Sequence, residues 1–234
     1  MIVIIDYNVG NLKSVLGAFK RIGLDAVVSR DEKIIKEAKG IVLPGVGTFP
    51  TAMKNLEKYH LVELLKERKE AGIPILGICL GMQITVIEYA RNVLGLNEAD
   101  SREFNENAKD KVIDYMPGQN DDIDKGGTLR LGAYPCILKE NSMIKKYYGI
   151  NNISERHRHR YEFNNDYRDV FEKKGLVLSG ISPDGRLIET VELSDKPFFI
   201  GVQFHPEFKS RPNRAHPLFV GFIEAALKYS MGGK

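Results

Sequence analysis

One cysteine lies between two glycines at the point where a strand pattern gives way to a helix pattern. The segment Gly77-Ile78-Cys79-Leu80-Gly81 begins within the end of the apolar run 73–78 and precedes a helical pattern over 83–93. Flanking glycines permit the strained turn of a nucleophile elbow, which holds a nucleophile at the top of a sheet. A helix N-terminus beneath Cys79 favours the attacking thiolate. The pattern indicates a nucleophile, and a buried small apolar side chain is the alternative interpretation.

A base and a carboxylate follow a late strand pattern. The run 198–204 leads directly into His205-Pro206-Glu207. Residues two apart in an extended segment point to the same side, so His205 and Glu207 can face each other. A carboxylate that orients an imidazole completes a Cys-His-acid system. The alternative is a surface histidine beside an acid, but both candidate groups follow strands, where open α/β sheets place their sites.

Acyl transfer also needs hydrogen-bond donors for the oxyanion that develops in the transition state. The amide of Leu80, directly after the cysteine, is one candidate donor. The loop Gly45-Val46-Gly47 is the candidate source of a second, because glycine lets the backbone approach a substrate closely.

The elements that must position these groups alternate between strand and helix in the first part of the chain, which predicts crossover units and a mostly parallel sheet. Asn11 caps a predicted helix that Gly23 ends. The strands are predicted at 3–5, 26–28, 40–43 and 73–78, and the next helices at 56–71 and 83–93.

The polar stretch 101–127 is predicted to be a long loop or insertion, of the kind that often carries function. After it we expect strands near 129–138, 176–178, 187–191 and 198–202, a last helix over 217–228 and a frayed tail at 231–234. Together these elements predict a single α/β domain over residues 1–230, with helices on both faces of a central sheet.

Composition narrows the function classes. Among 234 residues the net charge is +3, too small to indicate a nucleic-acid or membrane surface. No apolar run is long enough for a spanning helix, and the N-terminus lacks a secretory signal pattern. Cys79 and Cys136 are the two cysteines, which fits a reducing compartment, so we expect a cytoplasmic protein. We expect neither a cofactor nor a metal ion.

Three segments carry a family resemblance. Pro44-Gly45-Val46-Gly47, the segment 77–83 and Gln203-Phe204-His205-Pro206-Glu207 resemble the signature motifs of the class I (triad) glutamine amidotransferases. The resemblance implies a flavodoxin-like three-layer fold. It also implies that the side-chain amide of L-glutamine is hydrolysed through a thioester on Cys79, and that the ammonia goes to a synthase partner.

Two parts of the chain resemble different members of this family. Residues 1–83 resemble the glutaminase subunit of imidazole glycerol phosphate synthase, and residues 77–230 resemble the glutaminase domain of CTP synthase. The hypothesis is a chimera with its fusion point near 77–83. The implied partner is the synthetase domain of CTP synthase or the barrel subunit of the other enzyme.

The CTP synthase pattern implies that Gln83, Glu103 and Arg160 hold the glutamine substrate. Glu103 can accept from the α-ammonium group and Arg160 can pair with the α-carboxylate. That family has Gly-Gly-Phe-Gly where this chain has Gly45-Val46-Gly47, so the loop of this chain departs from the family pattern. The alternative function is a catalytically silent scaffold or glutamine-binding module with a misaligned triad.

Overall fold

The computed structural model describes residues 1–45, 49–116 and 130–232 of the chain. Within them, one large sheet has nine strands in the order β2-β1-β3-β4-β12-β11-β10-β7-β8. The strands are β1 Ile2–Ile5, β2 Ala26–Ser29, β3 Gly40–Gly45, β4 Ile75–Cys79, β7 Arg130–Leu138, β8 Asn152–His159, β10 Leu176–Ile181, β11 Ile188–Leu193 and β12 Phe199–Val202.

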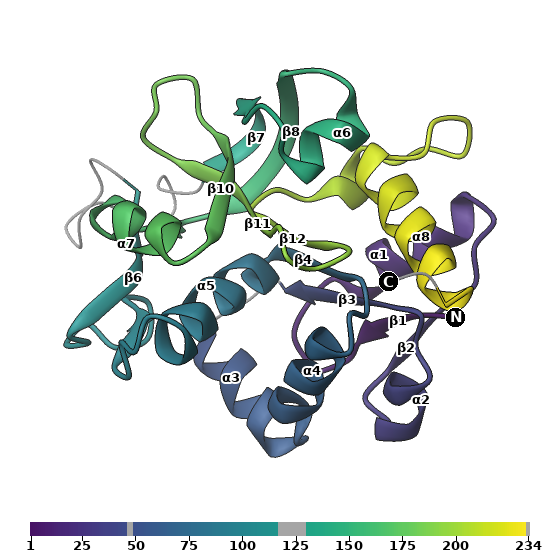
Figure 1. Ribbon diagram of the computed structural model, residues 1–234, viewed down its shortest axis with the longest axis horizontal. Coiled ribbons are helices and arrows are strands. Elements are labelled where there is room, and N and C mark those ends of the chain that lie inside the picture. The colour runs from purple at the N-terminus through teal and green to yellow at the C-terminus, as the bar shows by residue number, and fades with distance from the viewer. Residues whose placement is uncertain (46–48, 117–129, 233–234) are drawn as a thin grey trace.

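The sheet is parallel from β2 to β12 and antiparallel from β12 to β8. The expected α/β fold with helices on both faces is confirmed (Figure 1). One face is covered by α1 Leu12–Arg21, α6 Met143–Tyr148 and α8 Pro217–Ser230. The other is covered by α2 Glu32–Lys36, α3 Phe49–Lys58, α4 Leu61–Glu70, α5 Leu80–Asn92 and α7 Arg168–Lys173.

Strand alternation explains why both faces carry a core. On β1, Val3 and Ile5 pack into the core beneath α3, α4 and α5, whereas Ile2 and Ile4 pack against α1 and α8. Such strands have apolar residues at every position, which is why the apolar runs of the first part of the chain predicted them correctly. The helix α1 is capped by Asn11, whose side chain accepts from the Ser14 amide, and Gly23 follows its end at φ 78°.

The predicted helix over 56–71 is wrong, because two helices occupy this region. The helix α3 ends at Lys58 and α4 begins at Leu61, with His60 between them at φ 56°. A left-handed residue reverses the direction of the chain, so Leu56 of α3 and Leu64 of α4 can both reach the same core.

The predicted loop over 101–127 is also wrong in part. A three-stranded sheet forms from β5 Ala99–Ser101, β6 Asp110–Tyr115 and β9 Tyr161–Phe163, in that order. The buried pair Val112-Ile113 anchors β6 to the core beneath α5. Residues 117–129 lie outside the described part of the chain, and they include Leu129, the first residue of the predicted strand 129–138.

Of the helices in the described ranges, none is long and apolar enough to cross a membrane.

Candidate active site

Cys79 is the last residue of β4 and leads directly into α5. Its backbone has φ 54° and ψ −107°, a strained conformation for a residue with a side chain. The two flanking glycines make this turn possible. A Cβ at Gly81 would lie 2.0 Å from the Leu43 carbonyl oxygen, and one at Gly77 would lie 3.0 Å from the Gly81 backbone. The glycines therefore let α5 begin in contact with β3 and β4.

Two groups surround the sulfur of Cys79. Gln203 Nε2 donates to Sγ at 3.6 Å, and the Arg158 carbonyl oxygen lies 4.0 Å from Sγ. Gln203 was not among the predicted site residues, although it lies two positions before His205. The same alternation that drew attention to His205 and Glu207 identifies Gln203 as a neighbour of the site.

His205 and Glu207 are in contact, but through a different backbone shape from the one expected. His205 Nδ1 and Glu207 Oε1 are 2.8 Å apart. Residues Pro206–Phe208 form a short 3-10 helix rather than an extended segment, so the tight turn brings the two side chains together. The Phe208 ring stacks on the imidazole at 4.8 Å, and the His205 amide donates to the Arg156 carbonyl oxygen. Glu207 therefore holds the edge of the imidazole and Phe208 covers one of its faces, while the backbone bond fixes the residue itself.

The buried imidazole of His205 is electrostatically coupled to Cys79. Burial alone would disfavour the charged form, but the Cys79 side chain and Glu207 together raise the pKa of His205 to about 10. Nε2 of His205 is buried and makes no hydrogen bond within the described residues. The geometry leaves this nitrogen available to exchange a proton with a group at Cys79.

This shift predicts a pH effect on stability. The folded protein holds the His205 proton more tightly than the unfolded chain, so the contribution is complete below about pH 6.5 and is lost as the pH rises through about 10. We expect the Cys79→Ala substitution to reduce this loss, because it removes one of the groups that raise the pKa. Urea unfolding of both proteins across this pH range measures the free energy of unfolding. An equal dependence of this free energy on pH in the two proteins would contradict the coupling between His205 and Cys79.

Of the predicted oxyanion donors, Gly45 and Leu80 lie beside Cys79, whereas Val46 and Gly47 are outside the described residues. Gly45 ends β3 and pairs with Cys79 in the sheet. Leu80 is the first residue of α5, where backbone amides lack partners within the helix. A Cβ at Gly45 would lie 2.5 Å from Leu80 Cβ, so only glycine fits here without rearrangement.

The three residues implied to hold glutamine lie on different elements. Gln83 is buried in α5, and its Nε2 donates to the Tyr161 carbonyl oxygen at 3.0 Å and to Gln203 Oε1 at 3.1 Å. Arg160 joins β8 to β9, two residues after the carbonyl that faces Cys79. Glu103 follows β5, which lies across β6 from β9. The structure brings Gln83 and the Arg160 segment to the elbow, and places Glu103 just beyond the far strand of the small sheet.

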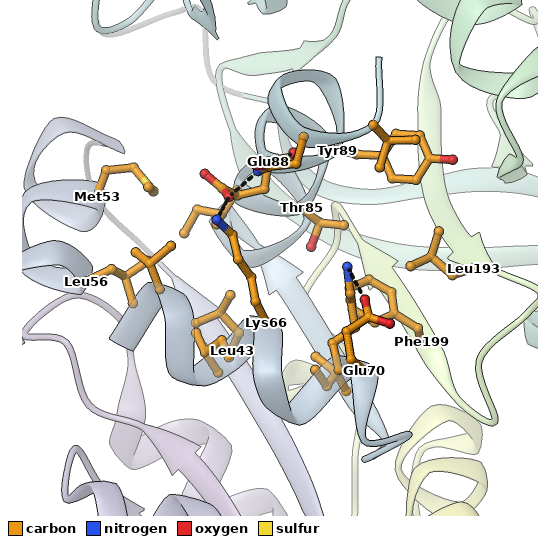
Figure 2. A pocket seen from close by; sticks show the side chains of 17 residues that line it. Leu43, Met53, Leu56, Lys66, Glu70, Thr85, Glu88, Tyr89, Leu193 and Phe199 are labelled. Carbon is orange, nitrogen blue, oxygen red and sulfur yellow. Dashed lines mark hydrogen bonds and ion pairs between the residues drawn. The ribbon is translucent and has the colours of Figure 1, made fainter. Parts of the chain in front are cut away.

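A separate apolar pocket of about 320 Å³ lies between α3, α4, α5 and the sheet (Figure 2). Its walls include Leu43, Leu56 and Phe199, and Lys66 pairs with Glu88 across its rim at 3.6 Å. None of the three triad residues lines it. Because acyl-transfer chemistry needs the nucleophile, this pocket is distinct from the candidate active site.

Comparison with known proteins agrees with this geometry. The family described as "Glutamine amidotransferase class-I" matches residues 3–225. A CTP synthase of Chlorobium phaeobacteroides is 54% identical over 201 residues, covering 86% of this chain and 34% of that protein. A CTP synthase of Staphylococcus aureus is 50% identical over 195 residues, covering 83% of this chain and 35% of that protein.

A solved structure extends the agreement to the fold. The glutaminase domain of a Trypanosoma brucei CTPS with bound acivicin superposes with a TM-score of 0.81 at 29% identity, covering 97% of this chain and 93% of that one. The chain spans about a third of the length of the curated relatives named above. Its elbow, its His-Glu pair and its whole three-layer fold are those of one family, and the chain belongs to the class-I glutamine amidotransferases.

Proposed function

We propose that this chain is a glutaminase that hydrolyses the side-chain amide of L-glutamine through a thioester on Cys79. The observation that carries the proposal is the strained turn of Cys79 facing an imidazole that is itself held by Glu207. A nucleophile, a base and an orienting acid in this arrangement are the requirements of acyl transfer.

In the first half of the reaction, the Cys79 thiolate attacks the amide carbon and forms a tetrahedral intermediate. The Leu80 amide, with a second donor from Gly45-Val46-Gly47, stabilises the oxyanion. His205 then donates a proton from Nε2 to the leaving nitrogen, and ammonia departs as the C–N bond breaks. Glu207 accepts from Nδ1 and keeps the ring in the orientation that both steps need.

In the second half, His205 takes a proton from a water molecule that attacks the thioester carbon. The C–S bond breaks, glutamate is released and Cys79 regains its thiolate. No atom beyond those of glutamine and water is consumed.

Three side chains are proposed to hold the substrate. Arg160 pairs with the α-carboxylate, Glu103 accepts from the α-ammonium group, and Gln83 contributes a hydrogen bond. The Nε2 of Gln83 is already engaged by Tyr161 and Gln203, so its contribution to the substrate comes from Oε1.

The released ammonia is proposed to serve a synthase. The CTP synthase relatives favour the synthetase portion of such an enzyme as the partner. Residues 1–83 resemble a different glutaminase subunit, so the barrel subunit of imidazole glycerol phosphate synthase is the second candidate. In that interpretation residues 1–230 are one domain with a fusion point near 77–83.

Covalent labelling tests the proposal. A glutamine-analogue electrophile is expected to add its mass to Cys79 alone, and excess L-glutamine is expected to slow the addition, as measured by mass spectrometry of tryptic peptides. Cys136 is the internal control, because burial raises the pKa of its thiol. Glutamine binding without an adduct and without glutamate release would instead identify the silent binding module.

A further inference from the structure

Five ionisable side chains are buried together next to the candidate active site, and the reaction proposed above uses none of them. They come from β7, β8 and β11 of the large sheet and β9 of the small sheet, and each is at most 7% exposed. The cluster, here called the buried network, consists of Arg130, His157, His159, Glu162 and Glu189. Buried charges are costly unless they are paired, so an arrangement of this size needs an explanation.

The network is a continuous chain of contacts. Arg130 Nη1 lies 2.6 Å from Glu189 Oε1 and 3.5 Å from Glu162 Oε1. Glu189 Oε2 lies 3.5 Å from His157 Nε2, and His157 Nδ1 lies 2.9 Å from His159 Nε2. His159 Nδ1 lies 3.3 Å from both the Tyr161 carbonyl oxygen and Glu162 Oε1, and the contact with Glu162 closes the chain into a ring.

The Tyr161 carbonyl fixes the direction of these hydrogen bonds. A carbonyl oxygen only accepts, so His159 carries its proton on Nδ1 and presents a lone pair at Nε2. His157 must then donate from Nδ1 to His159. With its one proton on Nδ1, His157 presents a second lone pair from Nε2 to the Glu189 carboxylate. Two acceptors would face each other unless one further proton is shared between His157 and Glu189.

The charge count agrees with a shared proton. Arg130 balances one of the two carboxylates, so a single proton held by the rest of the network makes it neutral, and loss of that proton leaves one buried negative charge. Burial raises the pKa of both Glu162 and Glu189, so these two carboxylates compete for the proton. Burial raises the pKa of Glu189 to about 7, despite the opposing effect of Arg130. The charged and titratable groups that act on Glu189 from the surrounding elements are Arg130, His157, Glu162, Asp184 and Cys136.

The network reaches the site through Tyr161. The Tyr161 carbonyl accepts from both His159 and Gln83, and Gln83 in turn bonds Gln203 beside Cys79. Arg160 lies between the two anchored residues, His159 and Tyr161. The bond from the His159 side chain ties together the residues on either side of Arg160, and it needs the proton that the network places on His159 Nδ1.

We propose that the buried network is a one-proton positioning device that holds the Arg160 segment in place for the α-carboxylate of glutamine. The inference rests on the proposed function for the role of Arg160. The members of the buried network are positioning residues, because they act on the substrate through the backbone at 159–161. The network is expected to change the KM for glutamine and to leave kcat nearly unchanged.

The decisive variant is Glu189→Gln, the neutral counterpart of a protonated Glu189. Its amide can accept from Arg130 and donate to His157 at every pH. We expect the KM of the unsubstituted protein to rise as the pH goes from about 6 to about 8.5, where the shared proton is lost. In Glu189→Gln we expect the KM to stay within about threefold across this range.

A second variant, His159→Phe, removes the bond to Tyr161 and is expected to raise KM about tenfold while kcat changes less than about threefold. His159→Asn is its matched control, because the amide nitrogen can replace Nδ1 and restore KM. If His159→Phe fails to fold, the pH dependence of KM in Glu189→Gln, compared with that of the unsubstituted protein, is sufficient to test the proposal.

Imidazole ¹⁵N NMR separates this inference from the proposed function, because it needs no turnover. Protons on Nδ1 of both His157 and His159 support the network even if the chain proves to lack glutaminase activity. A proton on Nε2 of His159, or the same pH dependence of KM in Glu189→Gln as in the unsubstituted protein, would overturn it.

Discussion

Replacing Cys79 with alanine is expected to lower glutamine hydrolysis by at least about 10⁴-fold, to the rate of the buffer blank. The thioester cannot form without the sulfur, and neither Gln203 nor the Arg158 carbonyl, the groups that contact Sγ, can replace a thiolate. Glutamate release, measured with the pure protein and saturating L-glutamine, gives the rate. Turnover retained by Cys79→Ala would refute the role of this residue.

Cys136→Ala is the matched control for that substitution. Cys136 lies in β7 with its side chain in the core next to Gly180, and it contacts no group of the triad among the described residues. We therefore expect this variant to keep turnover within about threefold, with a small loss of stability from the missing sulfur. An equal loss of turnover in both variants would point to unfolding rather than to chemistry.

The reactive residues could be predicted from sequence because each follows a strand within a short motif. Cys79 needs only its two glycines and the following helix to form the strained turn of an elbow, and His205 contacts Glu207 within two residues. Gln203 was missed because a glutamine before a histidine has no chemistry of its own. Its role depends on the distance to a sulfur 124 positions away.

The buried network could not be predicted from the sequence, for a different reason. The run Arg156-His157-Arg158-His159-Arg160 suggests a basic surface, yet the two histidines point inward while Arg156 and Arg158 are exposed. Alternation along a strand indicates that the two sets face opposite ways. It does not indicate which set is buried, because that depends on Arg130 and Glu189, which are 59 positions apart in the chain.

The fold was predictable where the sequence repeats a simple pattern. Fully apolar runs identified the parallel strands, whereas β5 and β6 escaped prediction because short strands among charged residues resemble a loop. The break at His60 escaped prediction for another reason. A histidine at positive φ has no sequence signal, and only the packing of both helices on one core requires it.

Gly81→Ala is expected to destabilise the protein by at least about 3 kcal/mol, near the upper end for overpacking. The added methyl group would lie 2.0 Å from the Leu43 carbonyl oxygen, which belongs to a central strand and cannot rotate away like a side chain. The helix α5 must then move from β3 and carry Leu80 and Cys79 with it. We expect both the urea midpoint and the rate of Cys79 labelling to fall.

Gly17→Ala is the matched control, because it makes the same chemical change in a helix with open space. The nearest atom to a Cβ at Gly17 outside the helix backbone is Arg21 Nη1 at 3.6 Å, the end of a flexible side chain. Alanine favours a helix over glycine by about 0.5–1 kcal/mol, so this variant should be slightly more stable. If Gly81→Ala proved as stable as Gly17→Ala, the close contact between α5 and β3 would not be what requires glycine in the elbow.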